Sequence, residues 1–351
     1  MFGVLITIHE FGHFIVARMC KVKINEFSIG MGPKILSKTA KKSGIVYSLR
    51  ALPLGGYVSM EGESEQSDNE NSFYKKPAWQ RLLISVAGPF MNILLGFLMT
   101  VVLVVTSLDA NGDIVMLSTT VGEFHKNAVS DDCGLQIGDE IIRVGGVNVH
   151  TGVELMYEIG MQGSKPLEPQ EGDEHTFVAV DLTVKRGGTT VVLNDVRFYA
   201  DSGEGFIMGS PDFKVYRDPV NFGNVIKHSF FRGVSSVKMV WDTLTGLFTG
   251  RFGFQAVSGP IGTTEAIATA ASDGWYPLIY FFTIISINLG IMNMLPLLPL
   301  DGGHIVFHLY EIIVRKPAPE KLRNALQLAG VVLLFGLMIV VAFKDIIGLF
   351  N

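Results

Sequence analysis

Four long apolar runs, separated by polar stretches, dominate this chain of 351 residues. They extend from Phe2 to Ala17, from Leu82 to Leu108, from Trp275 to about Leu300, and from Leu326 to about Ala342. Because a helix that crosses a bilayer needs about 20 apolar residues, these runs predict about four transmembrane helices, the first within 1–20, the second at 81–108 and the last two within 275–351. The first run is slightly short, and we expect either a short first helix or a start placed somewhat too far downstream.

The polar stretch 21–80 contains two short segments in which apolar and polar residues alternate, Ile45–Arg50 and Gly55–Met60, around Leu52-Pro53-Leu54. Alternation bounded by turn residues predicts a β-hairpin. Beside a membrane site, such a hairpin can offer its edge to an extended peptide, and a plain connector is the alternative. We therefore expect a cytoplasmic-side loop that carries a membrane-associated β-hairpin.

Residues 109–222 have a soluble composition, with acidic residues, glycines and alternating strands such as Val178–Val184. Within them, Gly134–Val149 contains Gly138-Asp139-Glu140-Ile141 between two turns, and this string resembles a PDZ domain of the bacterial protease-associated kind. Since such domains bind chain termini or strands by edge pairing, the resemblance implies an extracytoplasmic α+β domain that filters substrates. A domain that only blocks access, or that packs on the membrane part, is the alternative.

Apolar residues recur every three or four positions between Phe222 and Phe252, with charged residues between them. This spacing predicts an amphipathic helix. Its several charges favour a position on the membrane surface over a crossing. We assign residues 223–274 to a membrane-surface region, and packing on the soluble domain is the alternative.

The composition agrees with a membrane protein, because only 17% of the residues are charged and the mean hydropathy is +0.37. A net charge of −5, without a basic stripe, argues against a nucleic-acid partner. Basic residues that follow the first and third apolar runs place both loops in the cytoplasm and residues 109–222 outside. The two cysteines, Cys20 and Cys133, provide neither a disulfide framework nor a thiolate zinc site. Any metal must therefore be bound by His, Asp or Glu.

The first apolar run contains the motif His9-Glu10-Phe11-Gly12-His13. On a helix, histidines four positions apart project from one face, where they can bind one Zn²⁺ while Glu10 lies beside the metal to handle a water proton. Ionisable residues in a membrane helix are costly and are functional by default. The string also arises by chance, and a histidine on an apolar helix is often a core residue. A zinc site therefore needs a third ligand.

Asp301 is the candidate for that ligand. It follows Pro296 and Pro299 at the end of the third apolar run and precedes Gly302-Gly303-His304. A carboxylate there is costly unless it has a charged partner, and two imidazoles with one carboxylate leave an open position for water, as in catalytic zinc sites. A helix cap or an ion-pathway carboxylate remains the alternative, and His304 is either a metal neighbour or interfacial.

These features together resemble the site-2 protease family of intramembrane zinc metalloproteases, in particular its bacterial RseP-like branch. The resemblance covers nearly the whole chain and rests on His9–His13, Gly55–Val58, Ala87-Gly88-Pro89 with Asn92, the PDZ-like insert, Ser258–Gly262, Asn293, Pro296 and Asp301-Gly302. It implies that His9, His13 and Asp301 bind zinc and that Glu10 is the general base. It also implies that Asn293 and the hairpin residues Gly55, Gly56 and Tyr57 engage the substrate.

The expected fold is an α-helical polytopic membrane protein with a membrane-associated β-hairpin and an inserted PDZ-like α+β domain. The expected function is zinc-dependent cleavage of transmembrane segments in the bacterial plasma membrane, in regulated intramembrane proteolysis after a first extracytoplasmic cut. Protein substrates such as anti-sigma factors or signal-peptide remnants, and the lipid bilayer, are the expected partners. One rival is a non-proteolytic membrane PDZ adaptor or quality-control binding protein. The other is a metal transporter, which would need ligands repeated along several spans.

Overall fold

The computed structural model describes residues 1–63, 67–163, 167, 176–203, 206–253, 257 and 259–348. Ser258 of the Ser258–Gly262 motif lies outside these residues. The described chain divides into two compact units, the first made of 1–96, 259–261 and 280–351, and the second of 97–258 and 262–279. Each unit has its own packing and is described by itself.

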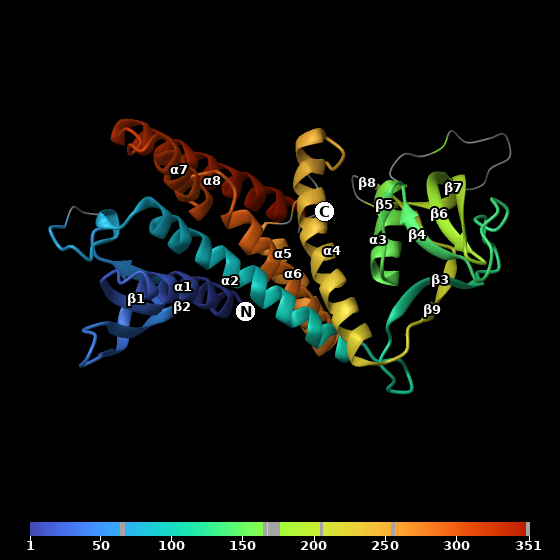
Figure 1. Cartoon of the computed structure of the whole chain (residues 1–351), viewed down its shortest axis with the longest axis horizontal. Helices are drawn as coiled ribbons and strands as arrows, with labels where there is room; N and C mark the ends of the chain where they lie inside the picture. The colour runs from blue at the N-terminus through green and yellow to red at the C-terminus, as the bar shows by residue number, and fades with distance from the viewer. Residues whose placement is uncertain are drawn as a thin grey trace. The chain divides into compact units, whose positions relative to one another are not determined.

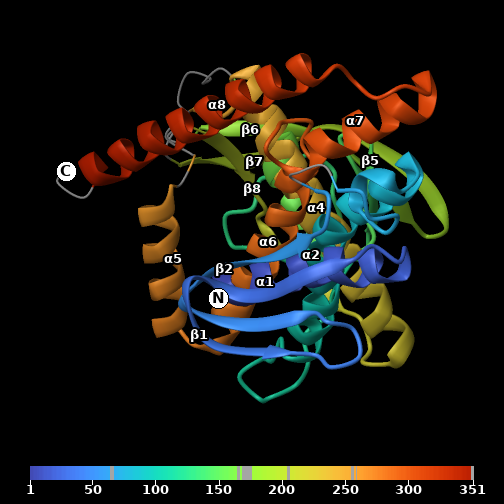
Figure 2. The same ribbon diagram turned by 90° about the vertical axis from the view of Figure 1, so that its left-hand side faces the viewer.

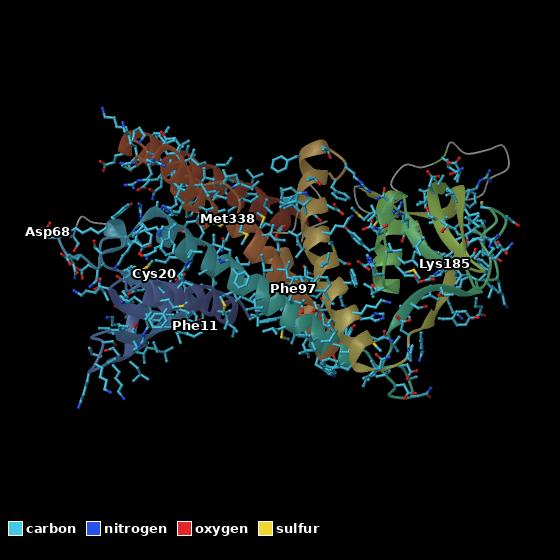
Figure 3. All side chains as sticks on the ribbon, in the orientation of Figure 1. Phe11, Cys20, Asp68, Phe97, Lys185 and Met338 are labelled. Carbon is cyan, nitrogen blue, oxygen red and sulfur yellow. The ribbon has the colours of Figure 1, made fainter. Side chains whose placement is uncertain are left out.

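Four helices of the described chain are long and apolar enough to cross a membrane. They are α1 (Phe2–Met19), α2 (Ala78–Val105), α6 (Trp275–Asn293) and α8 (Glu320–Gly348), of which Glu320–Ile347 is the candidate span. Apolar side chains stand out along much of α8, where Met338 is 46% exposed (Figure 3). Exposed apolar surface of this extent is typical of a helix that faces lipid. The chain is a polytopic membrane protein.

The third apolar run does not form one helix. α6 ends at Asn293, and a new helix, α7 (Asp301–Val314), begins where we expected the run to finish. Pro296 and Pro299 lie between them, and two prolines so close together disfavour a continuous helix, because each lacks a backbone N–H and clashes with the preceding turn. The first turn of α7 packs tightly on this connection, because a β-carbon at Gly302 would collide with the carbonyl oxygen of Leu295. The two glycines after Asp301 therefore allow the connection to lie against α7.

Strands β1 (Ile24–Thr39) and β2 (Val46–Met60) form the sheet of the first unit, beside α1 (Figures 1 and 2). We expected 45–50 and 55–60 to pair with each other, and this prediction is wrong. Both segments pair with the same stretch of β1: Tyr47 and Val58 are each opposite Phe27. Residues 24–29 thus separate the two predicted strands. Segment 56–60 lies at the edge of the sheet.

A polar cluster fixes the middle of this sheet. The Glu26 carboxylate accepts hydrogen bonds from Ser48, Lys34 and Arg50. The distance is 2.9 Å from Lys34 Nζ to Oε2 and 2.9 Å from Arg50 Nη2 to Oε1. Arg50 also donates to the Tyr57 hydroxyl. These contacts join all four extended segments of the sheet, 24–29, 34–39, 46–50 and 56–60, through side chains, in addition to the backbone ladder.

The second unit contains strands β3–β9 around one hydrophobic core. Their bounds are Leu117–Phe124, Glu140–Val144, Val147–Asn148, Phe177–Arg186, Thr189–Gly203, Phe206–Ser210 and Phe213–Arg217. The sheet has the order β8-β7-β6-β4-β3-β9, with β5 paired to β4, and helix α3 (Gly152–Gln162) packs on it. The core includes Phe198, Ile141 and Leu155, all fully buried. A capping box between Thr151 and Glu154 starts α3.

The expected amphipathic helix is α4 (Phe222–Thr249), and a further helix, α5 (Pro260–Ser272), follows it. One face of α4 contacts α3, since Lys238 forms an ion pair with Glu158 of α3 at 2.9 Å and the Tyr157 hydroxyl of α3 donates to Asp242 at 2.9 Å. Packing on the sheet domain, the alternative interpretation, is therefore part of the structure. Apolar side chains such as Trp241 and Phe248 remain exposed on α4, and the membrane-surface assignment stays a prediction.

Candidate metal centre

His9 and His13 project from one face of α1, as their spacing predicts. Both are buried, at 7% and 9% exposure, and their Nε2 atoms lie 3.2 Å apart. α1 packs closely on α2, because a β-carbon at Gly12 would collide with the carbonyl oxygen of Ala87. The glycine of the motif thus lets the two helices approach until the histidines reach the face of α2.

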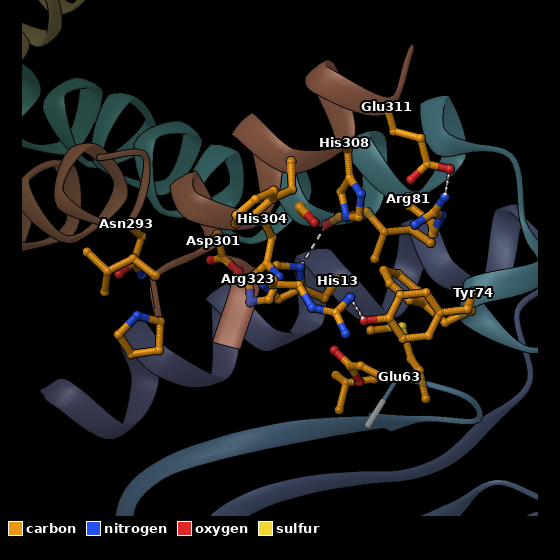
Figure 4. Close-up of a pocket in the computed structure, with 18 of the residues that line it drawn as sticks. His13, Glu63, Tyr74, Arg81, Asn293, Asp301, His304, His308, Glu311 and Arg323 are labelled. Carbon is orange, nitrogen blue, oxygen red and sulfur yellow. Dashed lines mark hydrogen bonds and ion pairs between the residues drawn. The ribbon is translucent and has the colours of Figure 1, made fainter. Parts of the chain in front are cut away.

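Asp301, the first residue of α7, lies against both histidines (Figure 4). Its Oδ2 is 3.0 Å from His9 Nε2, and its Oδ1 is 3.5 Å from His13 Nε2. The N-cap of α7 is Leu300, and the helix start has no side-chain cap. The carboxylate therefore faces the imidazoles, and the helix-cap interpretation receives no support.

These three side chains fit a zinc ion. Among the described residues they are the one set of metal-binding type whose ligand atoms all lie within 4.8 Å of one another. Tetrahedral zinc with nitrogen ligands at 2.0–2.1 Å separates those ligands by about 3.3 Å, close to the 3.2 Å between the two Nε2 atoms. Gly88 on α2 leaves the space open, because a β-carbon there would collide with His13 Nε2 and lie 2.8 Å from His9 Nε2.

Each histidine also has a partner on its other ring nitrogen. The Nδ1 of His13 is 2.7 Å from the backbone oxygen of Ile84, so Nδ1 carries the proton and Nε2 is free to bind a metal. The Nδ1 of His9 lies 3.3 Å from the Asn92 amide and 3.4 Å from the Asn293 amide. Asn92 faces protein, with no exposed surface.

Glu10 lies beside the histidines without joining the ligand set. Its Oε2 accepts a hydrogen bond of 3.1 Å from the backbone N–H of Val58, in the edge segment of the sheet. A β-carbon at Gly56 would lie 3.6 Å from Glu10 Cγ. This edge and the carboxylate are therefore neighbours, which neither the motif nor the strand pattern indicated.

A cavity of about 630 Å³ opens at this centre, lined by Glu10, Asn293, Asp301 and a group of polar side chains from α2, α7, α8 and residues 73–75 (Figure 4). In that group Arg81 forms an ion pair with Glu311 at 2.6 Å, and Arg323 donates to the Tyr74 hydroxyl. Burial, with the charge of Arg81 nearby, lowers the pKa of His308 to about 3. An uncharged imidazole therefore lines this side of the cavity.

The predicted site residues divide into two sets. His9, Glu10, His13, Asn293 and Asp301 meet at the cavity, where Tyr57 is half-buried in the lining. Gly55 lies further off, at a φ of +89°, with the Met31 side chain beside it. His304 lines the cavity but is not part of the ligand set.

Sequence reasoning missed the Val58 amide, Gly88 and the group around His308. The His304-His308 spacing on one helix face was a signal for the last of these, because residues four positions apart are neighbours on a helix.

The comparisons with known proteins agree with this site. The model of peptidase family M50 matches residues 1–337. A Clostridium acetobutylicum protein named as a zinc metalloprotease is 33% identical, over 99% of this chain and 95% of its own length. One from Fusobacterium nucleatum is 31% identical over 100% and 98%. The Shouchella clausii zinc metalloprotease RasP is 28% identical over 100% and 98%.

The membrane helices, the buried imidazole pair and the facing carboxylate define a zinc metalloprotease of the membrane. The chain belongs to peptidase family M50, the site-2 proteases, as the resemblance of its motifs predicted. Its cofactor is Zn²⁺.

Proposed function

We propose that this protein cleaves transmembrane segments within the bacterial plasma membrane, after a first cut has removed the substrate's extracytoplasmic part. The observation that carries the proposal is the set of His9, His13 and Asp301, within hydrogen-bond reach of one another and beside Glu10, at a cavity built on apolar helices. A membrane adaptor without proteolytic activity has no use for these groups, because buried ionisable residues destabilise it without serving binding.

His9, His13 and Asp301 would hold the zinc ion, and the ion supplies a Lewis acid that polarises the scissile carbonyl and acidifies water. Glu10 takes the proton of the attacking water and passes it to the leaving amine. Its hydrogen bond from Val58 orients the carboxylate before the substrate arrives. Asn293, half-buried at the cavity, is placed to donate to the substrate backbone.

The substrate must be extended at the cut, because a helix engages its carbonyl groups in its own hydrogen bonds. The edge segment 56–60 is suited to bind it in this form. Backbone N–H groups alternate in direction along a strand, so the amides of Gly56 and Met60 point to the same edge as that of Val58. We propose that the substrate pairs with this edge, through Gly56 and the neighbouring positions Gly55 and Tyr57.

The sheet domain of the second unit is proposed to be a PDZ-like domain that restricts access to the cavity. Helix α3 lies against the edge strand β8, the place where PDZ domains add a peptide strand. The end of α3 packs tightly on β8 here, since a β-carbon at Gly163 would lie 3.1 Å from the Cα of Gly209. The tight contact favours steric restriction over peptide binding. Anti-sigma factors and signal-peptide remnants are the proposed substrates.

The exchange Glu10→Gln tests the catalytic assignment. We expect the variant to keep one zinc ion per chain and to lose cleavage by at least about 10²-fold, the range for a general base. The purified protein is reconstituted with single-span proteins trimmed on their outer side, and products are identified by mass spectrometry.

The matched control is Glu63→Gln, which changes another carboxylate of the cavity lining and should retain most of the cleavage. Cleavage by Glu10→Gln at the wild-type rate would contradict the proposal.

A further inference from the structure

Asn92 is a fully buried polar residue beside His9. It has no exposed surface, and its amide contacts His9 Nδ1 at 3.3 Å. Within the described part of the chain its Oδ1 has no hydrogen-bond partner. A buried carbonyl oxygen without a hydrogen-bond donor destabilises the folded protein, so the environment of Asn92 calls for an explanation.

The chemistry of His9 supplies one. Its Nε2 faces Asp301 and His13, the side on which a metal would bind. An imidazole that offers one nitrogen to a metal carries its proton on the other, and that N–H needs an acceptor. The oxygen and nitrogen of an amide are nearly interchangeable in shape. With the Asn92 amide turned by 180°, Oδ1 accepts the His9 Nδ1–H and has the donor that it otherwise lacks.

His13 shows the same arrangement with a different acceptor, since its Nδ1 meets the Ile84 backbone oxygen at 2.7 Å. Both acceptors lie on α2. Asn293 approaches the same His9 nitrogen at 3.4 Å, but a single N–H makes one strong hydrogen bond. Asn92 is fully buried, whereas Asn293 lines the cavity where a substrate enters.

We propose that Asn92 is a positioning residue that fixes the tautomer and ring orientation of His9 for zinc, and that this leaves the Asn293 side chain free for the substrate. The proposal rests on the proposed zinc ligands. A partner that orients a metal-binding histidine typically changes metal affinity by 10–100-fold when it is removed. Asn92 therefore acts on metal binding before any substrate is present.

The test is the zinc affinity of the full-length protein in detergent, measured by competition with a chelator of known affinity. Asn92→Leu keeps the size of the side chain but removes the acceptor, and it should weaken zinc binding by 10–100-fold. Asn92→Asp keeps an acceptor and should bind zinc at least as tightly as the wild type. With Co²⁺ as the probe, the absorption bands should change in Asn92→Leu and keep their tetrahedral pattern in Asn92→Asp.

Two controls distinguish the proposed role of Asn92 from a general effect of local packing and from a role in engaging the substrate. Ser286→Ala removes a hydroxyl that donates to the Asn92 backbone oxygen at 2.7 Å, and it should leave zinc affinity within about twofold. Asn293→Leu should lose cleavage but keep zinc.

Wild-type zinc affinity in Asn92→Leu overturns the proposal. If Asn92→Leu fails to fold, a 10–100-fold loss of zinc affinity in Asn92→Asp overturns it instead. Absence of zinc from the wild type would instead refute the ligand assignment itself.

Discussion

At the scale of single residues, the site depends on glycines, which leave space because they have no side chain, as much as on the side chains that could bind a metal. Gly12 lets α1 approach α2, Gly88 leaves room beside the two Nε2 atoms, and Gly302 allows the connection to pack under Asp301. The motif predicted the ligands from their chemistry. Of these glycines it contains only Gly12, because the space beside the ligands is also set by Gly88 of α2 and Gly302 of α7.

The exchange Gly88→Ala tests this requirement for space. A methyl group at Gly88 would occupy the position between the histidines, so we expect zinc affinity to fall at least tenfold without loss of the folded protein. The zinc affinity is measured as the zinc content per chain after dialysis against increasing concentrations of a chelator. The control is Gly336→Ala on α8, where a β-carbon would meet no atom within 4 Å. Equal zinc content in both variants would show that Gly88 serves helix packing alone.

At the scale of elements, the sequence predicted the helices better than the sheet. Long apolar runs identify membrane helices by length and composition, which are local properties. The order of strands depends on which segments meet, and alternation gives only their faces. Neighbours along the chain, 45–50 and 55–60, were expected to pair, whereas each pairs with 24–29. The short connection with Pro296 and Pro299 likewise concealed the start of α7 within an apolar run.

The Glu26 cluster makes the stability of this sheet depend on pH. Although burial raises the pKa of Glu26, hydrogen bonds from Ser48, Lys34 and Arg50 outweigh that effect and lower the pKa to about 2. A carboxyl group whose pKa is lower in the folded state stabilises it fully above its ordinary value near 4.5, and this stabilisation is lost as the pH falls towards 2. Amide exchange of residues 24–60, corrected for intrinsic rates, should therefore be less protected at pH 3 than at pH 5.

The variant Glu26→Gln provides the comparison for this pH dependence. It should be less protected at pH 5 and show little further loss at pH 3, since the amide does not titrate. The same decrease in wild type and variant would assign the effect to another group.

At the scale of the whole molecule, the part of the chain that the structure describes has two hydrophobic cores, one in each unit. One contains Phe14, Phe27 and Ile84 of the first unit, and the other contains Phe198 and the strands of the second. The chemistry belongs to the first unit, because every residue that lines the cavity lies in it. Loss of the second core should therefore leave the metal site intact.

Phe198→Ala tests this independence. Removal of a fully buried phenyl ring costs about 3–5 kcal/mol, a large part of the stability of a typical domain. We expect the sheet domain of the full-length protein to be digested at a lower urea concentration in pulse proteolysis, while zinc remains at one ion per chain.

The control is Val192→Ala, which shortens a side chain that is 60% exposed on the same strand. It should change the urea concentration at which the domain is digested only slightly. Loss of zinc in Phe198→Ala would show that the two units depend on each other.

The separation of Asp301 from the histidines has a consequence for biosynthesis. His9 and His13 are made first, and Asp301 follows about 290 residues later. At synthesis rates of about 5–20 residues per second, roughly 15–60 s pass between them. During that interval a ribosome-bound chain carries the proposed base and two of the proposed ligands but lacks the third. On the proposed assignment, the chain therefore cannot cleave other newly inserted membrane proteins until most of it has been translated.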